Sequence, residues 1–271
     1  MDDAQRLHCF ARRECMTRWR RWAEAYELLA RAAQARVPYS YTDEDYAIFP
    51  RYNLDQAVLE AVETFDPDLL PDVETLRTEL VGAASSAGKW SSQNEVEKRA
   101  VADERDALAD AFMRCDVSTL PADSMPYRRV LGALEKARTR QLLADTWGAA
   151  GGYWYPLGER THPTLIAFDL EDADEVEIQA RVVQFISDHG AGRVLEVREY
   201  GPSYELEPAP EDFAYNGAER FWTPKTGEWV VYCSHERSIT FGGSITRAFD
   251  EDRFHRGLIG NQPGSRWSIG G

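Results

Sequence analysis

Apolar residues in the first part of the chain recur every three or four positions, which is the spacing of one face of an α-helix. Between residues 4 and 36 these positions are Cys15, Trp19, Trp22, Tyr26, Leu29 and Ala33. Pro38 predicts the end of this helix, because proline cannot donate the next backbone hydrogen bond. The aromatic, acidic stretch 38–53 is then expected to be a loop, and Asn53 is the expected cap of the next helix.

Four further segments keep the helical spacing. They span 54–65, 73–84, 92–115 and 127–142. Asp72 precedes the second of these, and Ser92 with Glu95 forms a capping-box pattern at the start of the third. Short loops between helices favour antiparallel neighbours, so residues 1–147 are expected to form a helical bundle of about five helices.

The period changes after the glycine-rich stretch 148–152, which is the expected linker. A helical pattern at 174–189 is surrounded by strand patterns at 164–170, 193–200, 218–224 and 228–242. The last of these is either one strand or a hairpin that turns at residues 234–237. Residues 153–260 are therefore expected to form a small mixed α/β domain with a four- or five-stranded sheet, and 261–271 a flexible tail. The expected fold class is α+β.

The charge of the chain is strongly negative. Its 46 acidic and 31 basic side chains give a formal net charge of −15. This charge disfavours nucleic acid as the main ligand, since phosphate neutralisation needs a cationic surface, and it suits a basic protein partner. Residues 1–36 are the exception, with eight arginines against five carboxylates. Nucleic acid is therefore a lesser possibility, through Arg12, Arg13, Arg20 and Arg21.

The expected compartment is the cytoplasm. The charged residues among the first 25 interrupt any signal-peptide apolar stretch. No apolar run reaches the length of about 18 residues that a membrane span needs, so no membrane association is expected. Four scattered cysteines without a CxxC pair are typical of reduced thiols.

Motifs that bind phosphates, dinucleotides or metals are missing from the sequence, so we expect no cofactor and no metal. A catalytic site, if there is one, is expected on the C-terminal sheet. Its members are His235 as acid or base, Arg220 or Arg237 for an anion, and Glu196 or Glu236 in support. Neighbours on a strand point to opposite faces, so His235 and Glu236 can serve one substrate only where the backbone turns.

Aromatic and acidic residues combine in a second candidate site, expected to bind a partner. Tyrosine and tryptophan bury a large area and keep a polar edge, and carboxylates pair with guanidinium groups. The candidate residues are Tyr41, Asp43, Glu44, Asp45, Tyr46 and Trp222.

These observations favour an intracellular acidic protein that binds a basic partner rather than an enzyme. Immunity factors, antitoxins and accessory components of bacterial defence or secretion assemblies are proteins of this kind. The alternative is a hydrolase or a nucleic-acid-modifying enzyme that uses the His/Arg/Glu site.

Overall fold

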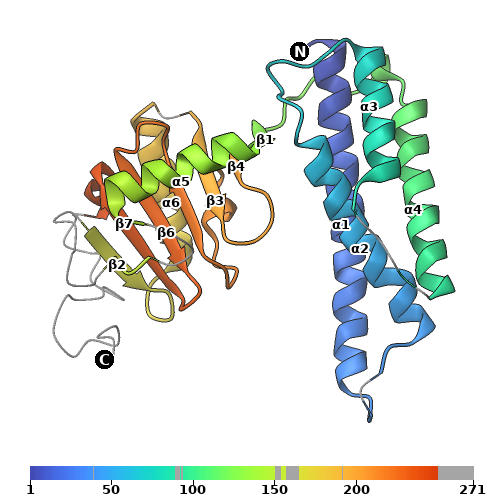
Figure 1. The fold of residues 1–271 in the computed structure, drawn as a ribbon, viewed down its shortest axis with the longest axis horizontal. Helices are drawn as coiled ribbons and strands as arrows, with labels where there is room; N and C mark the ends of the chain where they lie inside the picture. Colours follow the sequence, from blue (N-terminus) through green and yellow to red (C-terminus); the bar gives the residue numbers. More distant parts are fainter. Residues whose placement is uncertain are drawn as a thin grey trace. The chain divides into compact units, whose positions relative to one another are not determined.

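The computed structural model divides into two compact units, Met1–Met125 and Pro126–Gly271 (Figure 1). It describes residues 1–38, 40–88, 92, 94–149, 154–156, 165–190 and 192–249. The predicted tail 261–271 lies outside the described residues. The predicted fold class is confirmed: a helical bundle precedes a region with an antiparallel sheet and helices. Among the described residues, no helix is long and apolar enough to cross a membrane.

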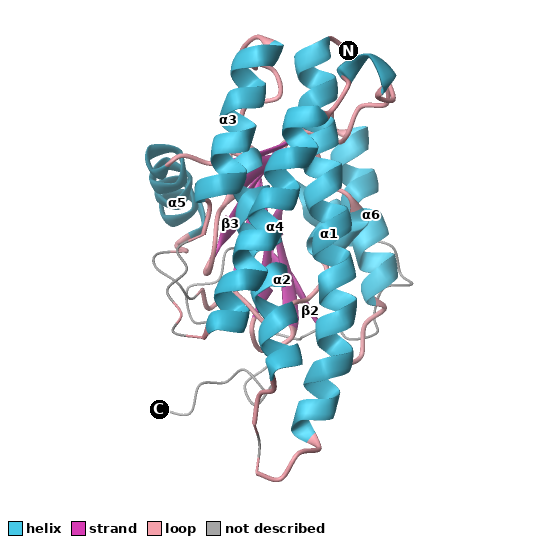
Figure 2. Ribbon diagram, turned by 90° about the vertical axis from the view of Figure 1, so that its right-hand side faces the viewer, coloured by secondary structure: helices cyan, strands magenta, loops and turns pink. Residues whose placement is uncertain are grey.

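Four helices form the bundle and lie alongside one another (Figures 1 and 2). They are α1 (Asp3–Gln34), α2 (Asp43–Val62), α3 (Val73–Ser86) and α4 (Glu95–Arg114), followed by the short 3-10 helix η1 (Val117–Thr119). Their apolar stripes meet in one core that includes Leu7, Cys15, Leu54, Val58, Leu76, Leu80, Leu108 and Phe112. For α1, α3 and α4 the periodicity therefore predicted both the helix and the face that it buries.

Helix α2 begins ten residues before the predicted start at Asn53 and Leu54. Thr42 is its N-cap, and the Asp45 side chain bonds back to the Thr42 backbone N–H at 2.6 Å, which completes a capping box. The helix continues through Pro50. The stretch 38–53 was expected to be a loop because it follows Pro38 and is aromatic and acidic, and that expectation is wrong from Asp43 onwards.

The second unit is built on a seven-stranded sheet in the order β1-β4-β3-β5-β6-β7-β2, with all neighbours antiparallel. The strands are β1 (Arg128–Val130), β2 (Leu165–Asp169), β3 (Val194–Arg198), β4 (Tyr204–Leu206), β5 (Arg220–Thr223), β6 (Trp229–Ser234) and β7 (Ser238–Gly243). The sequence predicted four or five strands. The strands that it missed, β1 and β4, have three residues each, which is too short for a pattern of alternation to show.

Helices cover both faces of the sheet. Helix α5 (Ala133–Trp147) packs through Leu143 and Trp147 on one face, against Val197, Phe221 and Val230. Helix α6 (Glu175–Asp188) covers the other face, with the 3-10 helices η2 (Pro210–Phe213) and η3 (Ser244–Phe249). Figure 1 shows α5 and α6 on opposite sides of the strands. Helix α5 was predicted as the fifth helix of the bundle, but its apolar face fits the sheet, and periodicity alone cannot distinguish the two.

The segment 228–242 is a hairpin rather than one strand. Residues 235–237 form the turn between β6 and β7. Arg237 has a φ of 60°, and its backbone N–H donates to the Ser234 carbonyl at 3.2 Å. His235, Glu236 and Arg237 are exposed on this turn.

Candidate functional site

The start of α2 combines exposed carboxylates with a cluster of rings. Asp43 and Glu44 lie exposed in the first helical turn. The rings of Tyr41, Tyr46 and Phe49 pack together with centroids 5.7–6.2 Å apart, and Tyr41 is 46% exposed. We call these five residues the acidic aromatic surface. The capping box holds the turn in place, so the helix fixes the spacing of the two carboxylates.

Asp45 has a different role from its two neighbours. Its side chain is buried and pairs with Arg36, with Nη1 2.5 Å from Oδ2. Burial acts to raise the pKa of this carboxyl, but hydrogen bonds from Arg36 and Thr42 hold the pKa below its ordinary value. Of the three predicted acidic residues, Asp45 therefore stabilises the helix start, and Asp43 and Glu44 remain at the surface.

Trp222 lies in the core, where no partner can reach it in this fold. Its ring is fully buried in the cluster beneath α6, 5.0 Å from the ring of Phe213. Strand β5 alternates, so Trp222 faces α6 and Phe221 faces α5. The strand itself was predicted. The burial of Trp222 was not, because it depends on which elements cover each face of the sheet.

Arg220, predicted to bind an anion, is instead a buried structural cation on the α6 face. It is 5% exposed, and its Nη1 lies 3.4 Å from Glu196 and 3.1 Å from the Asp212 carbonyl oxygen. Burial lowers the pKa of this guanidinium. Glu196 is itself fully buried and also accepts two hydrogen bonds from Arg198, at 2.8 and 2.9 Å. These charges neutralise one another inside the sheet layer.

His235 pairs with a carboxylate that the sequence analysis did not single out. Glu219 is 1% exposed and accepts hydrogen bonds from the Tyr232 hydroxyl and from the His235 backbone N–H. Its Oε1 also contacts Nδ1 of His235. The bond to Glu219, and further the charges of Glu236 and Glu199, raise the pKa of His235. Glu219 directly precedes β5 and His235 directly follows β6, so the pair depends on how these two strands pair, which no local sequence signal marks.

The predicted catalytic set is therefore divided. Glu236 and Arg237 stand on the turn with His235, whereas Arg220 is buried on the α6 face beside Glu196. Arg237 lies over the ring of Tyr215, with its Cζ 5.6 Å from the centroid, and Tyr215 donates to the His235 carbonyl at 2.8 Å. These contacts hold the turn in one conformation.

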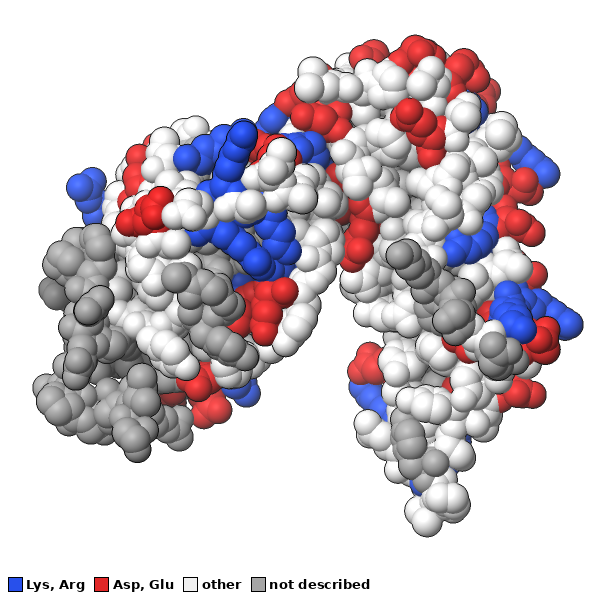
Figure 3. Space-filling model, viewed as in Figure 1, with Lys and Arg blue, Asp and Glu red and all other residues white. Residues whose placement is uncertain are grey.

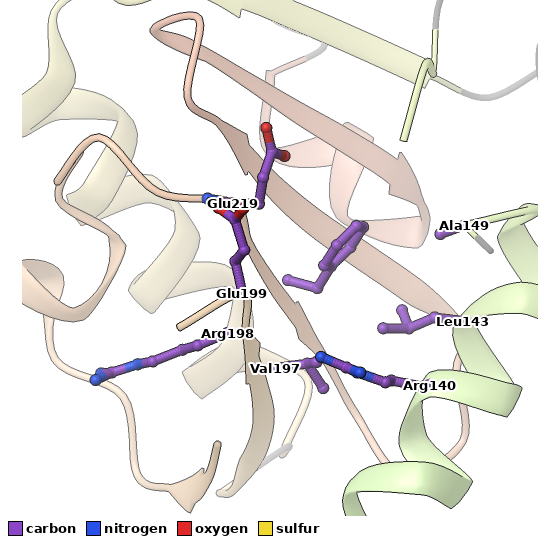
Figure 4. Close-up of a pocket in the computed structure, with 8 residues that line it drawn as sticks. Arg140, Leu143, Ala149, Val197, Arg198, Glu199 and Glu219 are labelled. Atoms are coloured by element: carbon purple, nitrogen blue, oxygen red, sulfur yellow. Dashed lines mark hydrogen bonds between the residues drawn. The ribbon is translucent and has the colours of Figure 1, made fainter. Parts of the chain in front are cut away.

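A shallow pocket lies between α5 and the sheet, beside Glu219 (Figure 4). It has an empty volume of about 300 Å³, counting its open mouth. Its lining is mixed in character, with Arg140, Leu143, Ala149, Val197, Arg198, Glu199, Glu219 and Phe221. Figure 4 shows Arg140 extending from α5 towards Val197.

The basic residues of α1 are divided between structural and exposed positions. Arg12 is buried and pairs with the buried Glu63 at 3.3 Å, and Arg13 donates to the Asp123 carbonyl at 2.6 Å. Arg20 and Arg21 are exposed. Of the four arginines suggested for nucleic acid, Arg12 is therefore internal to the bundle, and Arg20 and Arg21 are the exposed ones.

Lys and Arg side chains gather over α5 on the face drawn in Figure 3. Within the described residues, no group of three or more His, Cys, Asp or Glu side chains is arranged to hold a metal ion. Comparisons of this chain with protein-family models, curated proteins and solved structures find no significant match.

Proposed function

We propose that this protein is an interaction protein that binds a basic, arginine-rich partner at the acidic aromatic surface. One observation carries the proposal. Asp43 and Glu44 are exposed beside a ring cluster, and neither has a basic partner among the described residues. Arg36 neutralises Asp45 and leaves these two uncompensated. Guanidinium groups pair with carboxylates and stack on tyrosine rings, so arginine matches both parts of the surface.

Immunity factors, antitoxins and accessory components of bacterial defence or secretion assemblies bind partners through charged surfaces of this kind. The proposal assigns the protein to that class and to the cytoplasm, where the free thiols Cys9, Cys15, Cys115 and Cys233 stay reduced. The net charge of −15 adds long-range attraction for a basic partner and speeds association.

The test is the affinity of a fluorescent octa-arginine peptide, measured by anisotropy at several salt concentrations. The double variant Asp43→Asn/Glu44→Gln should bind it about three- to tenfold more weakly, because two exposed ion pairs contribute roughly 0.2–1 kcal/mol each. The matched control is Glu74→Gln/Glu79→Gln, which removes the same charge from exposed positions of α3. Equal losses of affinity in the two double variants would show that the peptide responds only to the net charge of the chain, and would overturn the proposal.

The second candidate is an acid–base enzyme, favoured by the Glu219–His235 pair beside the pocket. A buried carboxylate that bonds one ring nitrogen orients the imidazole and stabilises its charged form. Raised by Glu219, the pKa of His235 favours a proton donor over a base. Hydrolysis of model ester or RNA substrates that His235→Gln abolishes would support this candidate, and a rate unaffected by that substitution would exclude His235 from the chemistry.

A further inference from the structure

Three basic side chains on α5 have no acidic partner among the described residues. They are Lys136, Arg138 and Arg140. Lys136 donates a hydrogen bond of 3.4 Å from its Nζ to the Gly201 carbonyl. Arg138 and Arg140 are exposed. The other cations on this side of the unit do have partners: Arg129 bonds Glu135 at 2.8 Å, and Lys225 bonds Glu205 at 2.6 Å.

Two of the three side chains repel each other within the helix, and Arg138, two residues from each of them, lies on the other flank of the exposed side. Lys136 and Arg140 are one turn apart, and burial together with the charge of Arg140 lowers the pKa of Lys136. Like charges at this spacing destabilise a helix by a few tenths of a kcal/mol, roughly 0.2–0.5. The chain has 46 acidic side chains that could pair with these three cations. Arg18 and Arg51, by comparison, both pair with the buried Glu104. The unneutralised group points to an anionic ligand.

We propose that the exposed side of α5 docks an acidic peptide segment of a partner protein, whose carboxylates pair with Lys136, Arg138 and Arg140. Guanidinium groups pair with carboxylates in a planar, two-pronged geometry. The apolar walls of the neighbouring pocket, Leu143, Val197 and Phe221, lie beside Arg140. This surface belongs to the second unit and is independent of the acidic aromatic surface, so each proposal stands or fails alone.

Charge favours a peptide over a nucleic acid. Nucleic-acid affinity grows with the number of phosphates neutralised, and three cations on a chain of net charge −15 neutralise few. Figure 3 shows the Lys and Arg side chains over α5 with Asp and Glu side chains at the edges of the same unit, which limits the length of chain that can bind.

The experiment measures binding of a fluorescent octaglutamate peptide to the 271-residue chain. The triple variant Lys136→Gln/Arg138→Gln/Arg140→Gln should bind about tenfold more weakly, since three exposed ion pairs contribute roughly 0.2–1 kcal/mol each. The matched control Arg20→Gln/Arg21→Gln/Arg99→Gln removes the same charge from exposed positions of the bundle and should bind within about twofold of the wild type. The single reversal Arg138→Glu, at an exposed position, should also weaken binding and keeps the test valid if the triple variant unfolds.

Three results would overturn the proposal. The first is equal binding by the wild type and the α5 variants. The second is an equal loss of binding in the control variant. The third is tighter binding of an eight-nucleotide single-stranded DNA that the α5 substitutions also weaken, which would assign the surface to nucleic acid instead.

Discussion

Asp55 is fully buried in the helical bundle, and neither of its carboxylate oxygens has a hydrogen-bond partner there. Burial, and then the nearby charge of Glu104, raise its pKa to about 8 despite Arg18, Arg21 and Arg51. Glu104 shows the opposite outcome: burial would raise its pKa, but hydrogen bonds from Arg18 and Arg51, each at 2.8 Å, lower it. The two carboxyls differ because the arginines bond Glu104 and not Asp55.

The substitution Asp55→Asn should stabilise the protein, and increasingly so as the pH rises. The folded state keeps a proton on Asp55 that the unfolded state releases near pH 3.8, so wild-type stability falls between that value and about pH 8. One proton corresponds to about 1.4 kcal/mol per pH unit. From about pH 5.5 to about pH 7.5 the advantage of the variant in urea unfolding should therefore grow by about 2–3 kcal/mol. Asp45→Asn should instead destabilise above pH 4, because the pKa of Asp45 is lowered; a flat difference for Asp55→Asn would contradict this account.

Glu219→Gln should lower the pKa of His235 towards its ordinary value of 6.5, since the bond to Glu219 is the main cause of the rise. A raised pKa means that protonated His235 stabilises the folded state at low pH, and that this contribution disappears as the pH rises through the folded pKa. NMR titration of the His235 ring measures the shift. Glu236→Gln, an exposed change on the same turn, should shift the pKa less. An unchanged pKa in Glu219→Gln would disprove the pairing.

At the level of elements, the end of β7 is fixed by close contact between backbones. Gly243 has a φ of 78°, and a Cβ added there would lie 2.3 Å from the Glu228 carbonyl oxygen and 2.9 Å from the Trp147 ring. Trp147 also donates its indole N–H to the Gly227 carbonyl at 3.2 Å. Helix α5 and the β6–β7 hairpin can therefore pack this closely only where residue 243 has no side chain.

Gly243→Ala should lower the free energy of unfolding by more than about 3 kcal/mol, because the strained φ adds to the clash with the backbone. Gly217→Ala is the matched control: its φ is 81°, but a Cβ there meets open space. That variant should lose only about 1–2 kcal/mol. Chemical denaturation of both variants compares the two effects, and equal losses would show that φ alone, and not the contact with Glu228, limits residue 243.

At the level of the molecule, each unit buries its own core. The bundle core is formed by residues between Ala4 and Leu120, and the two cores of the sheet unit by residues between Val130 and Phe249. None of these three clusters of described residues takes members from both units. Burial of apolar area is the main stabilising term in folding, so each unit carries its own source of stability.

Residues 1–125 and 126–271 should therefore each fold when produced separately. Circular dichroism should show a helical spectrum for the first and a mixed one for the second, each with a cooperative thermal transition. The substitution Leu108→Ala removes a fully buried side chain of the bundle. It should lower the free energy of unfolding of 1–125 by about 2–5 kcal/mol. It should leave the transition assigned to 126–271 in the full chain unchanged. A single shared transition that shifts as a whole would contradict the independence of the two units.

Much of the fold could be predicted because the evidence is local. The stripe from Cys15 to Ala33 and the hairpin turn at His235 follow from residues within one or two turns of each other. The candidate sites were harder. Asp43 and Glu44 were correctly seen as accessible, but the arginine that binds Asp45 lies nine residues away on the chain. Glu219 meets His235 only through the pairing of β5 with β6.

The sequence by itself determined the type of each long element, the α+β class and the negative charge, because helix and strand periods and ionisable groups are properties of the residues themselves. Tertiary structure decided that α5 covers the sheet, that Trp222 and Arg220 are internal, and that Glu219 holds His235. These outcomes depend on which apolar faces meet and in what register, and that is settled by packing between segments that are distant along the chain.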